Sequence, residues 1–249
     1  MCVLNPSATI LFFYLMTVGA FGQDNAPKVV IGGPPALLTE QLRRHRIELT
    51  ESSLIKALQS TDPQVRDLAA AKLAEEKDMT AVPAISEALA KEKVTEIRID
   101  MAFSLALLGQ KKPVQELAND CYDLKLPGYF RARAILYTQR LGNKACFEAA
   151  LGLLSSDPDS RQQILSLLPQ YPHPSRGESE KIQETATRYL TDDSAMVRMQ
   201  AGMTLAILGD PLAIPDLENA AAREQDDEIR SQLESSLEQL RKKTDRTSK

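Results

Sequence analysis

One arginine recurs along this chain at intervals of 30 to 37 residues, at Arg66, Arg98, Arg131, Arg161, Arg198 and Arg230. Repeats of this length are typical of stacked helical hairpins. The residues one before, three after and seven after the arginine are apolar in nearly every copy. At about 100° per residue these positions share one helical face. The spacing therefore predicts six helices that each bury one face against neighbouring units.

The starts and ends of these helices are also legible. Asp62-Pro63 and Asp157-Pro158 each place an N-cap acceptor before a proline, which has no N–H to leave unbonded in the first turn. Gly109, Gly142 and Gly209 stand where a helix C-terminus requires a positive φ. A second helix is predicted before each arginine-bearing helix, at about residues 50–59, 81–90, 113–122, 145–154, 179–190 and 211–222.

These hairpins resemble HEAT repeats, especially the short bacterial kind first noted in phycobilisome lyases. The resemblance is carried by Asp62-Pro63-Gln64-Val65-Arg66-Asp67-Leu68-Ala69-Ala70, by Ala81-Val82-Pro83-Ala84-Ile85 and by the stretch from Leu205 to Leu217. It covers residues 50–241 and implies an all-α fold, an α-solenoid of about six HEAT-like hairpins. The third unit departs from the pattern at Leu126-Pro127-Gly128, and the chain after the fourth unit is broken at Pro172-His173-Pro174.

The chain divides into five predicted segments: a signal peptide at 1–22, a Pro/Gly-rich linker at 23–36, an N-terminal capping helix at 37–49, the repeat array at 50–242 and a charged tail at 243–249. The first 22 residues carry no charged side chain, and Ala20 and Gly22 are small residues at the −3 and −1 positions of a cleavage site. Their apolar run is shorter than the roughly 20 residues that span a bilayer. We expect export to the periplasm or the outside; an uncleaved membrane anchor is the alternative.

Composition and motifs disfavour several classes of function. The net charge is −4, whereas nucleic-acid binders usually carry a basic stripe. The two histidines, His45 and His173, lie far apart, and no Cys or His spacing resembles a zinc site. No glycine-rich phosphate loop or nucleophile motif is present. The sequence therefore predicts no catalytic residue, no metal, no cofactor, no nucleic-acid partner and no membrane contact after signal cleavage.

Cys121 and Cys146 would remain after signal cleavage. If successive outer helices run parallel and side by side, an offset of about nine residues separates the two cysteines by roughly 13 Å. A disulfide requires Cα atoms within about 7 Å of each other. We therefore expect two small buried side chains without a bond between them.

The recurrent arginine points toward a neighbouring repeat on the helical wheel. A partly buried guanidinium must be paired, so the six arginines are interpreted as structural, bonded to aspartates or carbonyls of the next unit. Replacing Arg198 by Ala is predicted to lower stability and to leave the choice of partner unchanged.

The concave face is where such arrays usually bind their partners. The positions two, six and nine residues after the arginine point away from the predicted core on the same wheel. Arg133, Tyr137 and Arg140 form a cationic-aromatic group there, of residue types enriched in binding hot spots; an ordinary solvated helix face is the alternative. The predicted partner-binding residues are Asp100, Ser104, Arg133, Tyr137, Arg140, Gln163, Gln200, Thr204 and Gln232.

Three interpretations of function remain open at this point. The favoured one is an exported, non-catalytic interaction or scaffold module that binds a protein or peptide on its concave face. The alternative, from the resemblance to phycobilisome lyases, is a lyase-like or enzyme-accessory protein that holds a modified protein substrate. Those lyases act in the cytoplasm, so export would separate the two. The third is a purely structural part of a larger envelope assembly.

Overall fold

The structure is a computed structural model that describes residues 35–247 of the chain. The predicted signal peptide and residues 23–34 of the predicted linker lie outside the described residues. All regular structure within the described range is helical. No helix within this range is both long and apolar enough to cross a membrane.

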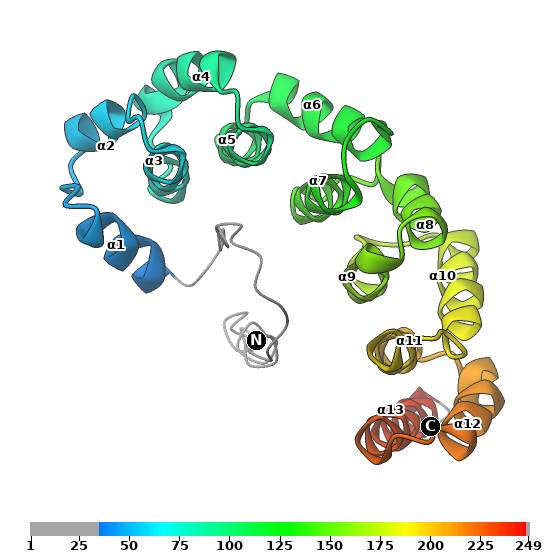
Figure 1. Cartoon of the computed structure of the whole chain (residues 1–249). Helices are drawn as coiled ribbons and strands as arrows, with labels where there is room; N and C mark the ends of the chain where they lie inside the picture. Colours follow the sequence, from blue (N-terminus) through cyan, green and yellow to red (C-terminus); the bar gives the residue numbers. More distant parts are fainter. Residues whose placement is uncertain (1–34, 248–249) are drawn as a thin grey trace, which may run out of the picture. The chain divides into compact units, whose positions relative to one another are not determined.

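The helices form two layers, which Figure 1 shows as an outer and an inner row. The outer layer consists of α2 (Glu51–Ala57), α4 (Val82–Lys91), α6 (Lys111–Tyr122), α8 (Phe147–Ser156), α10 (Arg176–Tyr189) and α12 (Ile214–Arg223). The inner layer consists of α3 (Pro63–Glu75), α5 (Thr95–Leu107), α7 (Gly128–Arg140), α9 (Arg161–Leu167), α11 (Ala195–Leu208) and α13 (Asp227–Thr247). Helix α1 (Pro35–Arg44) packs on α3 before the first hairpin. The predicted all-α solenoid of about six hairpins is confirmed.

The local signals in the sequence account for the helix boundaries. The Asp62 side chain accepts a hydrogen bond from the Gln64 amide at 2.9 Å, and Pro63 occupies the first helical position. The three predicted C-terminal glycines, Gly109, Gly142 and Gly209, have φ values of 79°, 71° and 77°. That conformation is strained for residues with a Cβ, so the prediction of glycine C-caps is confirmed.

Each inner helix buries two faces, because it packs on outer helices and also on the inner helices beside it. The buried apolar side chains fall into two large clusters, one between residues 42 and 108 and one between residues 118 and 240. A smaller cluster joins α5, α6 and α7 and contains Ile99, Ala102, Phe103, Ala106, Leu117 and Tyr137. The apolar core is therefore divided near the second and third hairpins.

The prediction that Cys121 and Cys146 stay unpaired is wrong. The two residues form a disulfide with their Cα atoms 5.9 Å apart. Figure 1 looks along the inner helices, and the outer helices lie across them, one after another. Cys121, in the last turn of α6, therefore meets Cys146 at the start of α8, and the Tyr122 hydroxyl donates to the Ala145 carbonyl at 2.8 Å beside them.

Both ends of the predicted array differ from the structure. Helix α1 begins within the predicted linker, at Pro35, and ends at Arg44, five residues before the predicted end of the capping helix. Helix α13 continues to Thr247 through most of the predicted charged tail. Arg241 pairs with Glu218 of α12, and Lys243 donates to the Ile207 carbonyl at 2.5 Å. These contacts tie the last turns of α13 to the preceding hairpins.

Gly128 starts the third inner helix in place of an Asp-Pro pair. A Cβ at this position would lie 1.5 Å from Oδ2 of Asp157, whose carboxylate fills the space. We expect Gly128→Ala to lower the free energy of unfolding by about 1–2 kcal/mol, because the Asp157 side chain must move. Urea unfolding measures the change.

Gly152 on α8 is the matched control, because a Cβ there would meet nothing within 4 Å. Alanine is the better helix former, so Gly152→Ala should raise the free energy of unfolding by about 0.5–1 kcal/mol. Equal effects of the two substitutions would show that the close approach of Asp157 to Gly128 does not exclude a side chain there.

Candidate functional site

The recurrent arginine lies close to the start of each inner helix. Arg66 donates to both carboxylate oxygens of Glu92, at 2.7 and 2.8 Å, and Arg198 does the same to Glu224 at 2.7 and 2.8 Å. Arg98 and Arg161 pair with the carboxylates of Asp120 and Asp192. Each of these carboxylates lies at the end of the following outer helix or just after it. The four ion pairs therefore join successive hairpins.

The other two of the six recurrent arginines bond mainly to backbone carbonyls. Arg131 donates to the Cys121 carbonyl at 3.1 Å and is only 8% exposed. Arg230, which has no further hairpin after it, donates to the Glu224 carbonyl at 2.9 and 2.6 Å and to Asp227 at 2.7 Å. The hydrogen bonds from Arg198 lower the pKa of Glu224 to about 2.

The residues predicted to line the concave face are mostly inside the inner layer. Five of the nine are buried, namely Asp100, Ser104, Tyr137, Gln200 and Thr204. Arg133 and Gln232 are half-buried, and Arg140 and Gln163 are exposed. The helical wheel allowed one buried face per helix, whereas neighbouring inner helices cover a second. The Thr204 hydroxyl, for example, donates to the Leu165 carbonyl of α9 at 2.9 Å.

Four of the inner-layer side chains form one charged cluster between α5 and α7. Arg133 donates to Asp100 and to Glu96, both at 2.6 Å. The Tyr137 hydroxyl donates to the same oxygen of Asp100 at 2.6 Å, and its ring stacks on Phe103 with centroids 4.1 Å apart. Arg133 and Tyr137 therefore bind other residues of the inner layer. Their assignment to a partner-binding surface is corrected.

A fifth member of this cluster, Asp67 on α3, was missed in the sequence. It is 1% exposed, and neither of its carboxylate oxygens has a hydrogen-bond partner among the described residues. Burial, with the nearby Asp100 carboxylate, raises the pKa of Asp67 well above its usual range. Burial also raises the pKa of Asp100 to about 7, against the opposing effect of Arg133. A signal was available, because Asp67, Asp100 and Arg133 follow one another at intervals of 33 residues.

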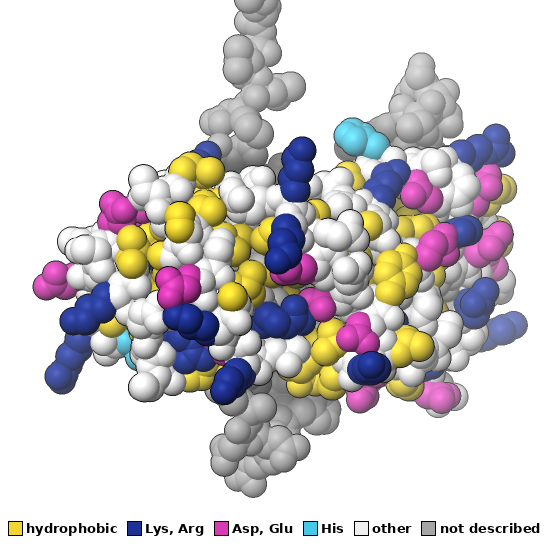
Figure 2. Space-filling model, turned by 90° about the horizontal axis from the view of Figure 1, so that it is seen from above, with side chains coloured by type: hydrophobic (Ala, Val, Ile, Leu, Met, Phe, Trp, Pro, Cys, Tyr) yellow, Lys and Arg dark blue, Asp and Glu magenta, His cyan; other side chains and the backbone are white. Residues whose placement is uncertain are grey.

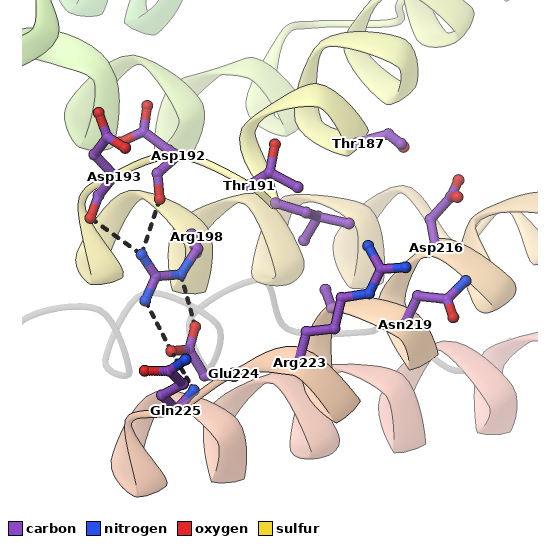
Figure 3. Close-up of a pocket in the computed structure, with 12 residues that line it drawn as sticks. Thr187, Thr191, Asp192, Asp193, Arg198, Asp216, Asn219, Arg223, Glu224 and Gln225 are labelled. Atoms are coloured by element: carbon purple, nitrogen blue, oxygen red, sulfur yellow. Dashed lines mark hydrogen bonds and ion pairs between the residues drawn. The ribbon is translucent and has the colours of Figure 1, made fainter.

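A long polar groove lies in the outer layer between α10 and α12. Two cavities of about 570 and 790 Å³ share Thr187 and Asp216 in their linings and make it continuous. Figure 3 shows Thr187 of α10 and Thr191, which follows that helix, across from Asp216, Asn219 and Arg223 of α12. The ion pair of Arg198 and Glu224 closes one end. Hydroxyl, amide and charged groups can therefore bind a ligand from both sides.

The groove carries an excess of negative charge. The two linings together contain seven carboxylates and three guanidinium groups. Glu184, Asp193 and Asp216 are exposed and make no ion pair with the described residues. In contrast, Figure 2 shows Lys and Arg side chains interspersed with Asp and Glu over the face seen from above. The sequence did not reveal the groove, because its carboxylates come from two separate hairpins.

The described residues contain no group of three or more His, Cys, Asp or Glu side chains that could hold a metal ion. The chemistry that the groove offers is hydrogen bonding and charge pairing along its length. Its arrangement suits the binding of an elongated polar ligand.

Comparison with known proteins adds the family. Residues 150–238 match the sequence model of HEAT repeats. No curated protein matches the chain. Among solved structures, that of human deoxyhypusine hydroxylase in complex with glycerol is similar, with 20% identity and a TM-score of 0.41. The alignment covers 76% of this chain and 73% of that chain, and the likeness concerns the helical fold alone.

The favoured interpretation from the sequence, a non-catalytic module that binds a partner on its concave face, is corrected. Most of the residues assigned to that face are buried, so they are not free to contact a partner. The assignment of repeats is confirmed by the match over residues 150–238, which spans the fourth to sixth hairpins. The first three hairpins continue the same two layers. The chain therefore contains HEAT repeats at residues 150–238.

Proposed function

We propose that the protein is an enzyme-accessory protein that holds a basic segment of a protein substrate in the groove between α10 and α12. The observation that carries this proposal is a set of three exposed carboxylates in the groove lining that make no ion pair with the described residues, Glu184, Asp193 and Asp216. A lysine or arginine side chain of the substrate would pair with each of them. The partner enzyme would act on the segment while it is held.

The size and lining of the groove support an extended segment of polypeptide. Its two cavities are each within the usual range of about 300–1,000 Å³ for a ligand site, and together they run along both helices. Gln183 and Thr187 on α10 and Asn219 on α12 offer hydrogen-bond donors and acceptors between the carboxylates. These amide and hydroxyl groups suit the backbone of a bound chain, whereas the carboxylates select its side chains.

The proposal predicts that a basic peptide binds and that the three carboxylates carry its selectivity. The probe is a fluorescently labelled octapeptide of alternating Lys, Arg and Gly, and the readout is fluorescence anisotropy. The triple variant Glu184→Gln, Asp193→Asn, Asp216→Asn should raise the Kd about tenfold, because exposed ion pairs contribute about 0.2–1 kcal/mol each. Higher salt should weaken wild-type binding in the same direction.

A matched control changes three exposed carboxylates outside the groove: Asp159→Asn, Glu228→Gln and Glu234→Gln. This variant has the same net charge as the groove variant, so it should bind the peptide as wild type does. Equal losses in the two variants would mean that only the overall charge matters. An acidic octapeptide that binds as tightly as the basic one would contradict the proposal.

We also propose that the chain is exported, as the sequence predicts. The disulfide between Cys121 and Cys146 supports this, because such bonds persist mainly in oxidising compartments. Mass spectrometry of protein alkylated during extraction from its native source should find both cysteines unalkylated. Full alkylation of both would count against export.

A further inference from the structure

The apolar core of the inner layer is divided at its charged cluster. One large cluster of buried apolar side chains ends at Leu108 and the other begins at Ala118. Between them, among the described residues, a small apolar cluster around Phe103 and Tyr137 joins α5 to α7. The ion pairs of Arg133 with Asp100 and Glu96 cross the same boundary. These ion pairs thus add to the apolar contacts of the small cluster in joining the first two hairpins to the rest.

Two buried carboxyl groups near this boundary are unpaired or only partly paired. Both oxygens of Asp67 and one oxygen of Asp100 accept no hydrogen bond from the described residues. Both residues are 1% exposed. A buried ionised carboxylate without partners is strongly disfavoured, and such a group takes up a proton instead. Proton binding is therefore the simplest way for α3 and α5 to stay packed here.

The charges that face the pair come from three places in the fold. Glu92, in the loop before α5, is already paired with Arg66. Glu96 on α5 and Arg133 and Tyr137 on α7 complete the set. With both aspartates ionised, three carboxylates share the single guanidinium of Arg133. One proton on Asp67 removes part of this repulsion.

We infer that the contact of α3, α5 and α7 is a proton-sensitive joint, which packs tightly when Asp67 is protonated and loosens when Asp67 and Asp100 are both ionised. The first two hairpins and α1 would then move relative to the later hairpins as pH rises. The groove between α10 and α12 lies outside this joint, so the joint and the proposed function are tested separately.

The sign of the pH effect follows from the directions of the two pKa shifts. Burial raises the pKa of Asp67 well above its ordinary value and that of Asp100 to about 7. The packed state therefore holds protons that the loosened state releases. As pH rises from about 4 to 7 and above, the loosened state gains, by at most about tenfold per pH unit for each proton released.

Amide hydrogen exchange at pH 5 and pH 8 tests the joint, with rates corrected for intrinsic exchange. In wild type, α3 and α5 should be protected at pH 5 and should exchange at least tenfold faster at pH 8. Asp67→Asn keeps the shape of the side chain but cannot ionise, so its change in protection between the two pH values should be smaller than that of wild type, with only Asp100 left to titrate. The control Asp159→Asn, on the surface, should behave as wild type does.

Asp67→Leu is a second neutral variant, for use if the asparagine variant does not fold. It too should show the smaller change. A pH response as large as that of wild type in a folded neutral variant would overturn the inference. Failure of both variants to fold would also overturn it, because the carboxyl would then be required for folding at any pH.

Discussion

Replacing both Cys121 and Cys146 by Ala is expected to lower the free energy of unfolding by about 3–4 kcal/mol. The bond joins residues with a sequence separation of 25. Loss of such a cross-link raises the conformational entropy of the unfolded chain and so stabilises the unfolded state by about this amount. The bond also joins α6 to α8, whose direct packing is slight. Urea unfolding of the oxidised protein and of the double variant measures the difference.

Two controls isolate the bond from the change of side chain. Cys2→Ala changes a cysteine outside the described residues and should leave the unfolding free energy unchanged. Wild type unfolded in the presence of a thiol reductant should match the double variant to within about 1 kcal/mol. A double variant as stable as oxidised wild type would show that the third and fourth hairpins are not joined by this bond.

Arg198→Ala is expected to lower the free energy of unfolding by about 2–3 kcal/mol. The substitution leaves the Glu224 carboxylate buried without its guanidinium, and the carbonyls of Asp192 and Asp193 lose a donor. Breaking a fully buried pair costs about 3–5 kcal/mol; the Arg198 side chain is 21% exposed, so the effect should be smaller. Chemical unfolding is again the measurement.

Arg230, another of the six recurrent arginines, provides the comparison. Its carboxylate partner Asp227 has a side chain that is 93% exposed, and solvent can replace it. Arg230→Ala should therefore cost only about 1 kcal/mol, mostly through the lost hydrogen bonds to the Glu224 carbonyl. If Arg230→Ala lowered the free energy of unfolding as much as Arg198→Ala does, ion pairing between hairpins would not explain why the arginine recurs.

The repeat and the helix boundaries could be predicted from the sequence because each depends on local chemistry. The apolar positions around the arginine follow the helical period, and capping residues such as Asp62 and Gly209 satisfy or reshape the backbone within one turn. These effects act within a few residues of the chain. The hairpin count and the all-α class followed from them.

The arrangement of helices around one another was not available from such local signals. The wheel placed Asp100 and Tyr137 on an open face, whereas the neighbouring inner helix covers them. The estimated distance between Cys121 and Cys146 assumed that outer helices lie parallel and side by side. In the structure the end of α6 meets the start of α8, because the outer helices lie one after another across the inner layer. Both errors concern the orientation of one hairpin relative to the next.

The charged cluster was partly visible and was assigned the wrong role. Arg133 and Tyr137 were singled out because they share one side of a helix, but Asp100, which binds both of them, lies one repeat earlier, and Asp67 lies two repeats earlier. A search for charged residues at the repeat interval would have placed Asp67 with Asp100. No sequence pattern pointed to the outer groove. Carboxylates such as Glu184 and Asp216 look the same in sequence as those on any exposed helix face.

Hydrogen exchange with and without the labelled basic octapeptide tests most directly where this protein binds. The proposed groove predicts slower exchange in α10 and α12 when the peptide is present, with little change in α5 and α7. The groove variant should lose this protection, and the surface control should keep it. Protection confined to the inner helices α5 and α7, or none at a saturating concentration of peptide, would contradict a binding site in the outer layer.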